Sequence, residues 1–256
     1  MDTLSEYNSV EAAKSATPAA YTEFLRRNFG PAAGLVEKYY NLSLFKDSPL
    51  PVIGAIATVV TDAQFKCPGY ASTAKAAHSG IPAWVYEFTH NSTCVWLDTM
   101  PQEAVSVFHA AHTAEIPYIF GNLHFDFHNS NTTCTGTAEE MKLSKQMRGL
   151  WTAMAENADP STDDIHWPQF QTSKDFQSPG MIFGNSSTAG KIDFSACELW
   201  SKVYEMLVGE NSTATATPTG GAKPTTPPKS GAVRMFSTAG SVAILSAVLS
   251  GVVSIV

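Results

Sequence analysis

Two histidines and a glutamate stand three residues apart near the middle of the chain, at His109, His112 and Glu115. They lie directly before the apolar run Ile116–Phe120, which is strand-like in composition. An imidazole titrates near pH ~6.5, so it can accept a proton and return it at neutral pH. This group of residues therefore indicates either general acid–base chemistry or a metal site.

A second group, His124-Phe125-Asp126-Phe127-His128, sets three possible metal ligands on one side of a strand. Neither group matches a known zinc spacing such as His-Glu-x-x-His. The sequence therefore predicts no metal site, and no cofactor is expected.

The segment from Phe108 to Gly121 resembles the catalytic-histidine segment of the type-B carboxylesterase and cholinesterase-like family. There a His, two variable residues and a Glu precede Leu/Ile-Pro-Tyr-x-Phe-Gly, and the histidine is the general base and acid of a Ser–His–Glu/Asp triad on an α/β-hydrolase fold. The matching position is His112. By the family order the triad acid precedes the histidine, so Glu115 is interpreted as a buried carboxylate that fixes the histidine loop.

The resemblance extends over about residues 50–207 and includes Asp62-x-x-Phe65-x-Cys67-Pro68, an alanine-rich helix ending near Gly80, and Tyr86-x-Phe88. It also implies the disulfides. In the family, the Cys of Phe-x-Cys-Pro bonds the Cys before the closing helix, which pairs Cys67 with Cys197 and leaves Cys94 with Cys134.

The nucleophile of this fold is a serine in Gly-x-Ser-x-Gly, and the sequence contains no such motif. The early carboxylates Asp2 and Glu6 lack the Glu-Gly context of the triad acid and are not assigned. We therefore expect the C-terminal part of an α/β hydrolase, with the last sheet strands and flanking helices. It would carry the base of a carboxylesterase without its nucleophile and be inactive alone, whereas the complete enzyme would bind a small-molecule ester.

The local pattern predicts an α/β succession of elements. Thr17 before Pro18 is a helix N-cap, and Gly30 ends that helix. The aromatic residues of 83–89 recur at the two-residue period of a strand, and Thr137–Glu140 is a capping box before a helix. Further expected elements are a helix over 34–40, strands at 181–183 and 192–194, and a closing helix from Cys197. Core positions are expected for Trp84, Tyr86, Trp151, Trp167 and Trp200.

The composition favours a secreted globular protein. With 256 residues, 44% hydrophobic side chains and a net charge of −7, the chain can build one domain and shows no basic cluster for nucleic acid. Its four cysteines and five Asn-x-Ser/Thr sequons are typical of an oxidising secretory compartment. The sequons are at Asn41, Asn91, Asn131, Asn185 and Asn211.

The composition changes at Glu210, so residues 1–209 are the expected esterase part. Residues 210–232 form a Ser/Thr/Pro stalk, and 233–256 end in an apolar tail. A small triplet from Ser230, a nine-residue spacer and a fifteen-residue tail match a GPI-attachment signal, with an uncleaved tail anchor as the alternative. We therefore expect a cell-surface protein bound to the membrane through a lipid at Ser230 or through this tail.

The first residues, Met1–Glu6, are acidic and polar and do not form a signal peptide. Together with the absent nucleophile motif, this leads us to expect a truncated upstream part. The alternative function is that of a non-catalytic, GPI-anchored surface or adhesion protein, because cholinesterase-like domains without a competent triad serve as binding modules.

Overall fold

The structure, a computed structural model, describes residues 10–97, 102, 105, 109–127, 132–213 and 253–255. Its main sheet has the strand order β5-β4-β1-β6. Strand β1 (Val85–Phe88) runs parallel to β4 (Gln177–Phe183), which turns back antiparallel as β5 (Ser187–Asp193). On its other side β1 pairs antiparallel with β6 (Val253–Ile255), so residues of the apolar tail lie in the sheet, which the sequence analysis does not foresee.

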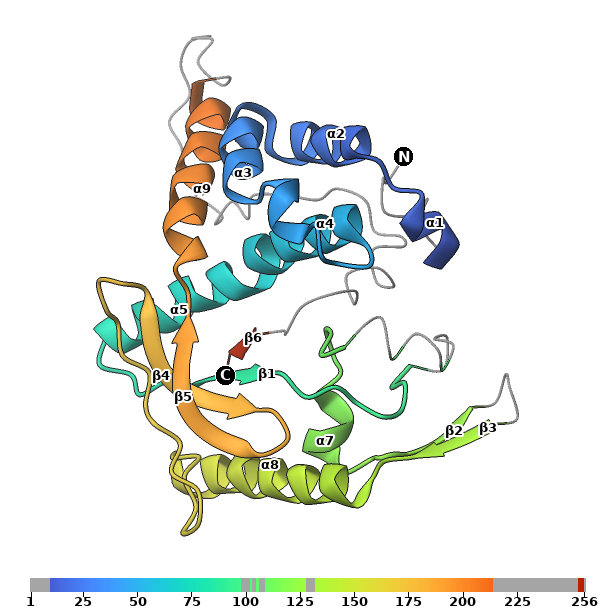
Figure 1. Ribbon diagram of the computed structural model, residues 1–256. Helices are drawn as coiled ribbons and strands as arrows, with labels where there is room; N and C mark the ends of the chain where they lie inside the picture. Colours follow the sequence, from blue (N-terminus) through green and yellow to red (C-terminus); the bar gives the residue numbers. More distant parts are fainter. Residues whose placement is uncertain are drawn as a thin grey trace, which may run out of the picture.

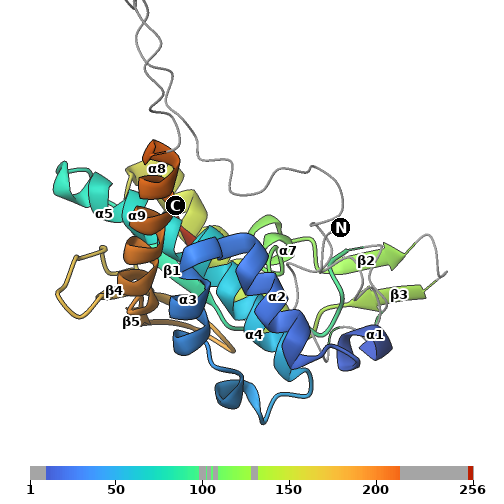
Figure 2. The same ribbon diagram turned by 90° about the horizontal axis from the view of Figure 1, so that it is seen from above.

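Helices form a layer on one side of this sheet (Figure 1). Its members are α2 (Pro18–Phe29), α3 (Ala33–Tyr39), α4 (Pro51–Thr61) and α9 (Ala196–Thr213), which remain grouped in the view from above (Figure 2). Helix α4 continues through a π-helix, η3 (Asp62–Lys66), into α5 (Cys67–His78). Shorter elements are α1 (Val10–Lys14) and the 3-10 helices η1 (Gly30–Ala32) and η2 (Leu42–Phe45).

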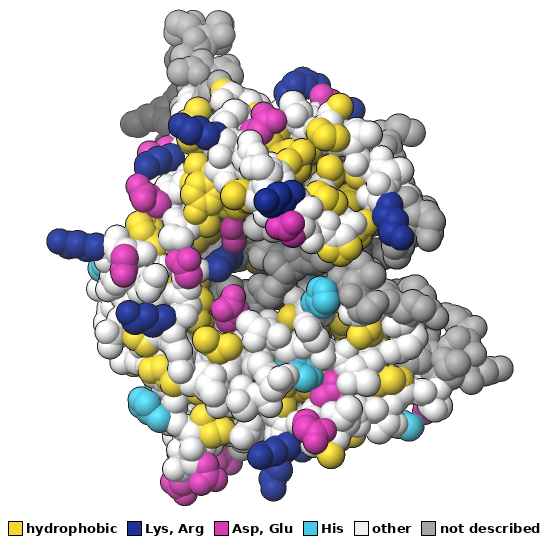
Figure 3. Space-filling view, viewed as in Figure 1, with side chains coloured by type: hydrophobic (Ala, Val, Ile, Leu, Met, Phe, Trp, Pro, Cys, Tyr) yellow, Lys and Arg dark blue, Asp and Glu magenta, His cyan; other side chains and the backbone are white. Residues whose placement is uncertain are grey.

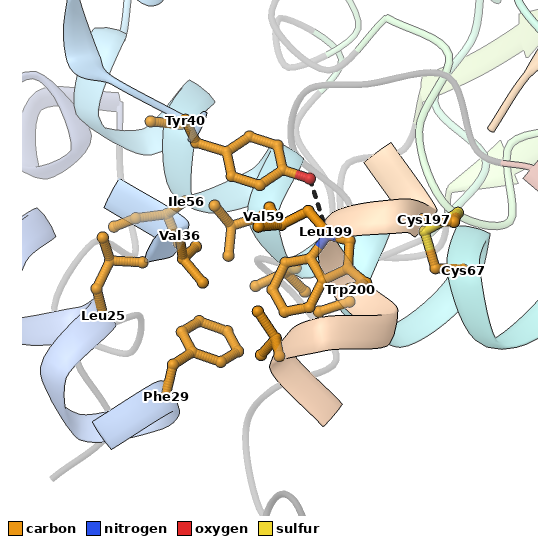
Figure 4. Packing of buried hydrophobic residues seen from close by; sticks show 14 of the residues in the cluster. Leu25, Phe29, Val36, Tyr40, Ile56, Val59, Cys67, Cys197, Leu199 and Trp200 are labelled. Carbon is orange, nitrogen blue, oxygen red and sulfur yellow. Dashed lines mark hydrogen bonds between the residues drawn. A yellow bond between two sulfur atoms is a disulfide. The ribbon is translucent and has the colours of Figure 1, made fainter. Parts of the chain in front are cut away.

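The helical layer has its own hydrophobic core, centred on the fully buried Trp200 of α9 (Figure 4). The ring of Phe29 lies 5.2 Å from that of Trp200, centroid to centroid. The indole N–H of Trp200 donates to the Tyr40 hydroxyl at 2.8 Å, and this hydroxyl donates to the buried Asp62 at 2.7 Å. Polar groups in this core are thereby satisfied across α9, the end of α3 and the start of the π-helix.

Helix α8 (Ala138–Asn157) covers the opposite side of the sheet (Figure 1). The alternation in β1 explains why the sheet has two cores, since Val85 belongs to the core of the helical layer whereas Tyr86 and Phe88 pack with Leu143 and Met147 of α8. Helix α8 begins with the expected capping box. The predicted strand at 83–89 and the predicted helix after Thr137 are thus confirmed.

Two disulfides connect segments that are distant in sequence. Cys67 at the start of α5 bonds Cys197 in α9, and Cys94 bonds Cys134. The latter lies in β3 (Thr132–Thr135), which pairs antiparallel with β2 (His124–Phe127). These are the same two pairs that the family resemblance implies.

The apolar run after Glu115 corrects one expectation, because it forms the helix α7 (Ile116–Phe120) and not a strand. Pro117 stands in its first turn, where a missing N–H costs nothing, and Gly121 ends it in the left-handed conformation with φ 70°. The run has no alternating pattern, and a single helical turn buries Pro117 and Tyr118 while Phe120 stays exposed. None of the helices in the described ranges has the length and hydropathy needed to cross a bilayer.

Candidate functional site

The candidate histidine lies in a tight loop, residues 109–115, which leads into α7. Three alanines of this loop are buried, at Ala110, Ala111 and Ala114. Two other residues have positive φ, His109 at 49° and Thr113 at 70°. This region of backbone space is unfavourable for residues with a Cβ, and most of all for a β-branched threonine. The loop is therefore a strained segment on a packed base, as is common at functional sites.

His112 is half-buried and contacts an aromatic ring from the helical layer. Its imidazole lies 4.8 Å from the ring of Phe65, centroid to centroid, at an interplanar angle of 43°. Phe65 reaches this position from the π-helix between α4 and α5, and single π-turns inside helices frequently accompany functional sites. The Nδ1 atom of His112 is buried and forms no hydrogen bond with any residue that the structure describes.

Trp96 contacts the same loop from the segment that follows β1. Its indole N–H donates to the hydroxyl of Thr113 at 3.0 Å, and this hydroxyl in turn donates to the carbonyl oxygen of His112. Trp96 stands two residues after Cys94, whose disulfide connects this segment to β3. The peptide of His112 is thereby connected, through the hydroxyl of Thr113, to a side chain outside the loop.

Glu115 is buried, with 5% of its surface exposed, as expected for a carboxylate that fixes the histidine loop. Its backbone carbonyl accepts from the amides of Tyr118 at 3.0 Å and Ile119 at 3.1 Å, so Glu115 is also the N-cap of α7. The position couples the orientation of the histidine loop to that of the helix.

The buried carboxylate of Glu140 joins three segments around α7. Its Oε1 accepts from the Tyr118 hydroxyl at 2.9 Å, from the Thr93 amide at 2.6 Å and from His90 Nε2 at 3.2 Å. Its Oε2 accepts from the Thr137 amide at 2.7 Å. The sequence analysis identifies Glu140 only as half of a capping box. Its link to Tyr118 and His90 depends on tertiary contacts that no local pattern shows.

The pKa values of Glu140 and Tyr118 agree with the hydrogen bond between them. Burial alone would raise the pKa of Glu140, but the hydrogen bonds from His90, Thr93, Thr137 and Tyr118 outweigh it and lower the pKa to about 2. Burial raises the pKa of Tyr118, to which the neighbouring Glu140 carboxylate adds. Glu140 is therefore an ionised acceptor and Tyr118 a protonated donor throughout the physiological range.

The other polar residues singled out from the sequence lie apart from one another. His109 is exposed, and His124 and Asp126 are an exposed pair 3.4 Å apart. In the described ranges no three His, Cys, Asp or Glu side chains are grouped so as to hold a metal ion. His128 lies outside these ranges.

The surface shown in Figure 3 carries basic and acidic side chains interspersed over both halves, without a broad area of one sign. Three of the sequon asparagines, Asn41, Asn91 and Asn185, are exposed and accessible for a glycan. Asn131, Ser230 and residues 214–232 lie outside the described residues, as does the side chain of Asn211. Residues 210–213, expected to begin the stalk, instead continue helix α9.

The core positions expected for the large aromatics are confirmed for most of them. Trp84, Tyr86, Trp167 and Trp200 are buried, whereas Trp151 is half-buried and packs against Tyr86 and Trp167 in the core beneath the sheet. These rings therefore serve packing. The aromatic residues that do contact the histidine loop, Phe65 and Trp96, have no such role in the sequence analysis.

Comparison with known proteins agrees with the residue pattern. Fumonisin B1 esterase of Sphingopyxis macrogoltabida is 26% identical over 71% of this chain and 32% of its own length. Acetylcholinesterase of Leptinotarsa decemlineata is 28% identical over 59% of this chain and 22% of its own length. Para-nitrobenzyl esterase of Bacillus subtilis is 29% identical over 44% of this chain and 20% of its own length. The chain thus spans about a third or less of the length of these relatives. A sequence model of the Carboxylesterase family matches residues 6–198, three quarters of the chain, and the protein belongs to that family.

Proposed function

We propose that this chain carries the general base, His112, of a carboxylic-ester hydrolase whose serine nucleophile and triad acid come from sequence outside these 256 residues. The chain alone would then not hydrolyse esters. Family membership supports the reaction class, and the lack of Gly-x-Ser-x-Gly supports the division of the site.

The observation that carries the proposal is the state of the His112 ring. Its Nδ1 is buried yet has no hydrogen-bond partner in the described part of the chain. A buried polar nitrogen left in this way costs about 1–3 kcal/mol, so the site favours an additional hydrogen-bond partner, which is an acceptor when Nδ1 carries the proton. In a triad, Nδ1–H donates to a carboxylate, which fixes the tautomer that leaves Nε2 free to act as the base.

The chemistry follows from that tautomer. Nε2 takes the proton of the serine hydroxyl while the serine oxygen bonds to the ester carbonyl carbon. When the tetrahedral intermediate collapses, the carbon–oxygen bond to the alcohol breaks and the imidazolium returns the proton to the leaving alcohol. Water then repeats both steps on the acyl-enzyme and releases the acid.

The substrate class is a small-molecule carboxylic ester. Fumonisin B1 esterase and para-nitrobenzyl esterase are named for ester substrates, which supports the class. At 26% and 29% identity these names do not select an acyl group or an alcohol.

A second candidate is a non-catalytic surface protein held by a GPI lipid. It is favoured by the lack of the nucleophile motif, by the three exposed sequons and by the small triplet, spacer and apolar tail after the stalk. The two candidates differ in whether His112 acts as a general base.

Hydrolysis of a p-nitrophenyl ester separates them. The purified chain should show no activity that depends on His112, whereas the chain joined to an upstream carboxylesterase segment with Gly-x-Ser-x-Gly and an acidic triad residue should turn the ester over. If the joined protein folds with the serine of Gly-x-Ser-x-Gly accessible to solvent and is still inactive, the non-catalytic candidate is favoured. Activity of the short chain that is lost in His112→Ala would show that an unrecognised nucleophile exists within it.

A further inference from the structure

We propose that Trp96 and Thr113 are positioning residues for His112, acting through a hydrogen-bond chain that ends on the peptide of the histidine itself. The inference rests on the proposed function insofar as His112 is the base. The hydrogen-bond chain and its effect on the loop can be tested without any ester hydrolysis.

The backbone next to His112 needs support from outside the loop. Thr113 has φ 70°, where a β-branched residue is a strong outlier, so this conformation is strained. Without a compensating contact the loop would relax to negative φ at Thr113. That relaxation would rotate the adjoining peptide and reorient the His112 side chain.

The compensating contact is the hydroxyl of Thr113. It accepts from the Trp96 indole N–H at 3.0 Å and donates its only proton to the carbonyl of His112. Consecutive hydrogen bonds polarise one another, so the two bonds together oppose the strain at Thr113. A residue without this hydroxyl could not connect the indole to the histidine peptide.

Trp96 is itself held by a separate part of the fold. It lies two residues after the Cys94–Cys134 disulfide and packs against the core beneath the sheet. With Cys94, Ala114 and Tyr118 it lines a small pocket at the base of the histidine loop. Because Phe65 contacts the imidazole ring from the helical layer, His112 is restrained through both its ring and its backbone.

The test uses the intact chain and diethyl pyrocarbonate, which acylates accessible neutral imidazoles. Peptide mass spectrometry gives the rate at His112 relative to His78, an exposed histidine of α5 in the same sample. Trp96→Phe keeps an aromatic ring without the N–H, and Thr113→Val keeps the shape without the hydroxyl. Loss of one hydrogen bond should raise the relative rate at His112 roughly fivefold in each variant.

Two further variants distinguish positioning from general stability. Thr113→Ser keeps the hydroxyl and should react like the wild type. Trp167→Phe removes another indole hydrogen bond, to the carbonyl of Val85 at 3.1 Å, and should leave the His112 rate unchanged even if it lowers the melting temperature.

Wild-type reactivity of His112 in Trp96→Phe and Thr113→Val would overturn the proposal, as would an equal increase in Trp167→Phe. Should Trp96→Phe fail to fold, Thr113→Val against Thr113→Ser decides the matter. The expected reactivities together with an inactive completed enzyme would reject the base role of His112 while leaving the positioning role intact.

Discussion

Two buried carboxylates, Asp62 and Glu140, show how the number of hydrogen-bond donors decides whether a buried acid is ionised. Asp62 starts the π-helix that carries Phe65; burial raises its pKa, and the hydrogen bond from Tyr40 offsets this only in part. Glu140 is just as enclosed, but it accepts four hydrogen bonds, and its pKa falls to about 2. Glu140 therefore contributes to stability as an anion, whereas the fold favours the neutral form of Asp62.

This difference predicts an acid-dependent loss of stability. A folded pKa of about 2 against the ordinary 4.5 means that ionised Glu140 stabilises the fold above about pH 5 and that this contribution disappears as the pH falls toward 2. The full contribution is roughly 3 kcal/mol. In urea unfolding at a series of pH values, Glu140→Gln should be less stable at neutral pH and show a shallower decline in acid. The exposed neighbour variant Glu139→Gln is the control, and an equally steep decline in Glu140→Gln would contradict the assignment.

At the scale of elements, sequence patterns within one segment predict the helices and strands whose ends or faces those same residues specify. The Thr17–Pro18 start, the capping box at Thr137 and the alternation of residues 83–89 each specify an element, and each forms. The sequence pattern does not predict helix α7, because five apolar residues fit either a strand or a helix. Pro117 and Gly121 at its ends favour the helix. The contact between Phe65 and His112 joins residues far apart in sequence, so no pattern within one segment could predict it.

Helix α8 supports α7 and the sheet by packing, which gives a second prediction. Met147 is fully buried beneath the sheet, so Met147→Ala should lower the free energy of unfolding by about 2–5 kcal/mol. Lys145 is exposed on the same helix, and Lys145→Ala should change it by less than about 0.5 kcal/mol. Equal effects in chemical denaturation would mean that this face of α8 is not the packed one.

At the scale of the whole molecule, the disulfide Cys67–Cys197 closes most of the described fold. Its sequence separation is 130 residues, against 40 for Cys94–Cys134. Cys67–Cys197 joins α5 to α9, and Cys94–Cys134 joins the segment after β1 to β3 of the hairpin, so each restrains a different part of the unfolded chain.

Loop-closure entropy predicts the order of their contributions. Removing the long closure by Cys67→Ala with Cys197→Ala should cost about 5 kcal/mol, and removing the shorter one by Cys94→Ala with Cys134→Ala about 4 kcal/mol. Denaturant unfolding of the two double variants measures this. A clearly larger loss of unfolding free energy on removing Cys94–Cys134 would show that the disulfides stabilise the protein mainly through native-state packing and not through the entropy of the unfolded chain.

The proposed GPI lipid at Ser230 would remove the apolar tail and, with it, the strand β6 from the edge of β1. Phosphatidylinositol-specific phospholipase should release an export-competent form of the protein from cells, because it cleaves the lipid from the protein. Membrane retention beside a released control protein, with Val242–Val256 still found by mass spectrometry, would refute the attachment.

The central claim is that His112 is the general base of ester hydrolysis. It is tested most directly by turnover of the completed enzyme, which is this chain joined to an upstream carboxylesterase segment with Gly-x-Ser-x-Gly and an acidic triad residue. The measurement is the kcat of that enzyme and of its His112→Ala variant on a p-nitrophenyl ester, with circular dichroism as the control for folding. The account predicts a loss of several orders of magnitude with an unchanged fold, as removal of a triad base produces. A folded His112→Ala enzyme that keeps most of its turnover would contradict it.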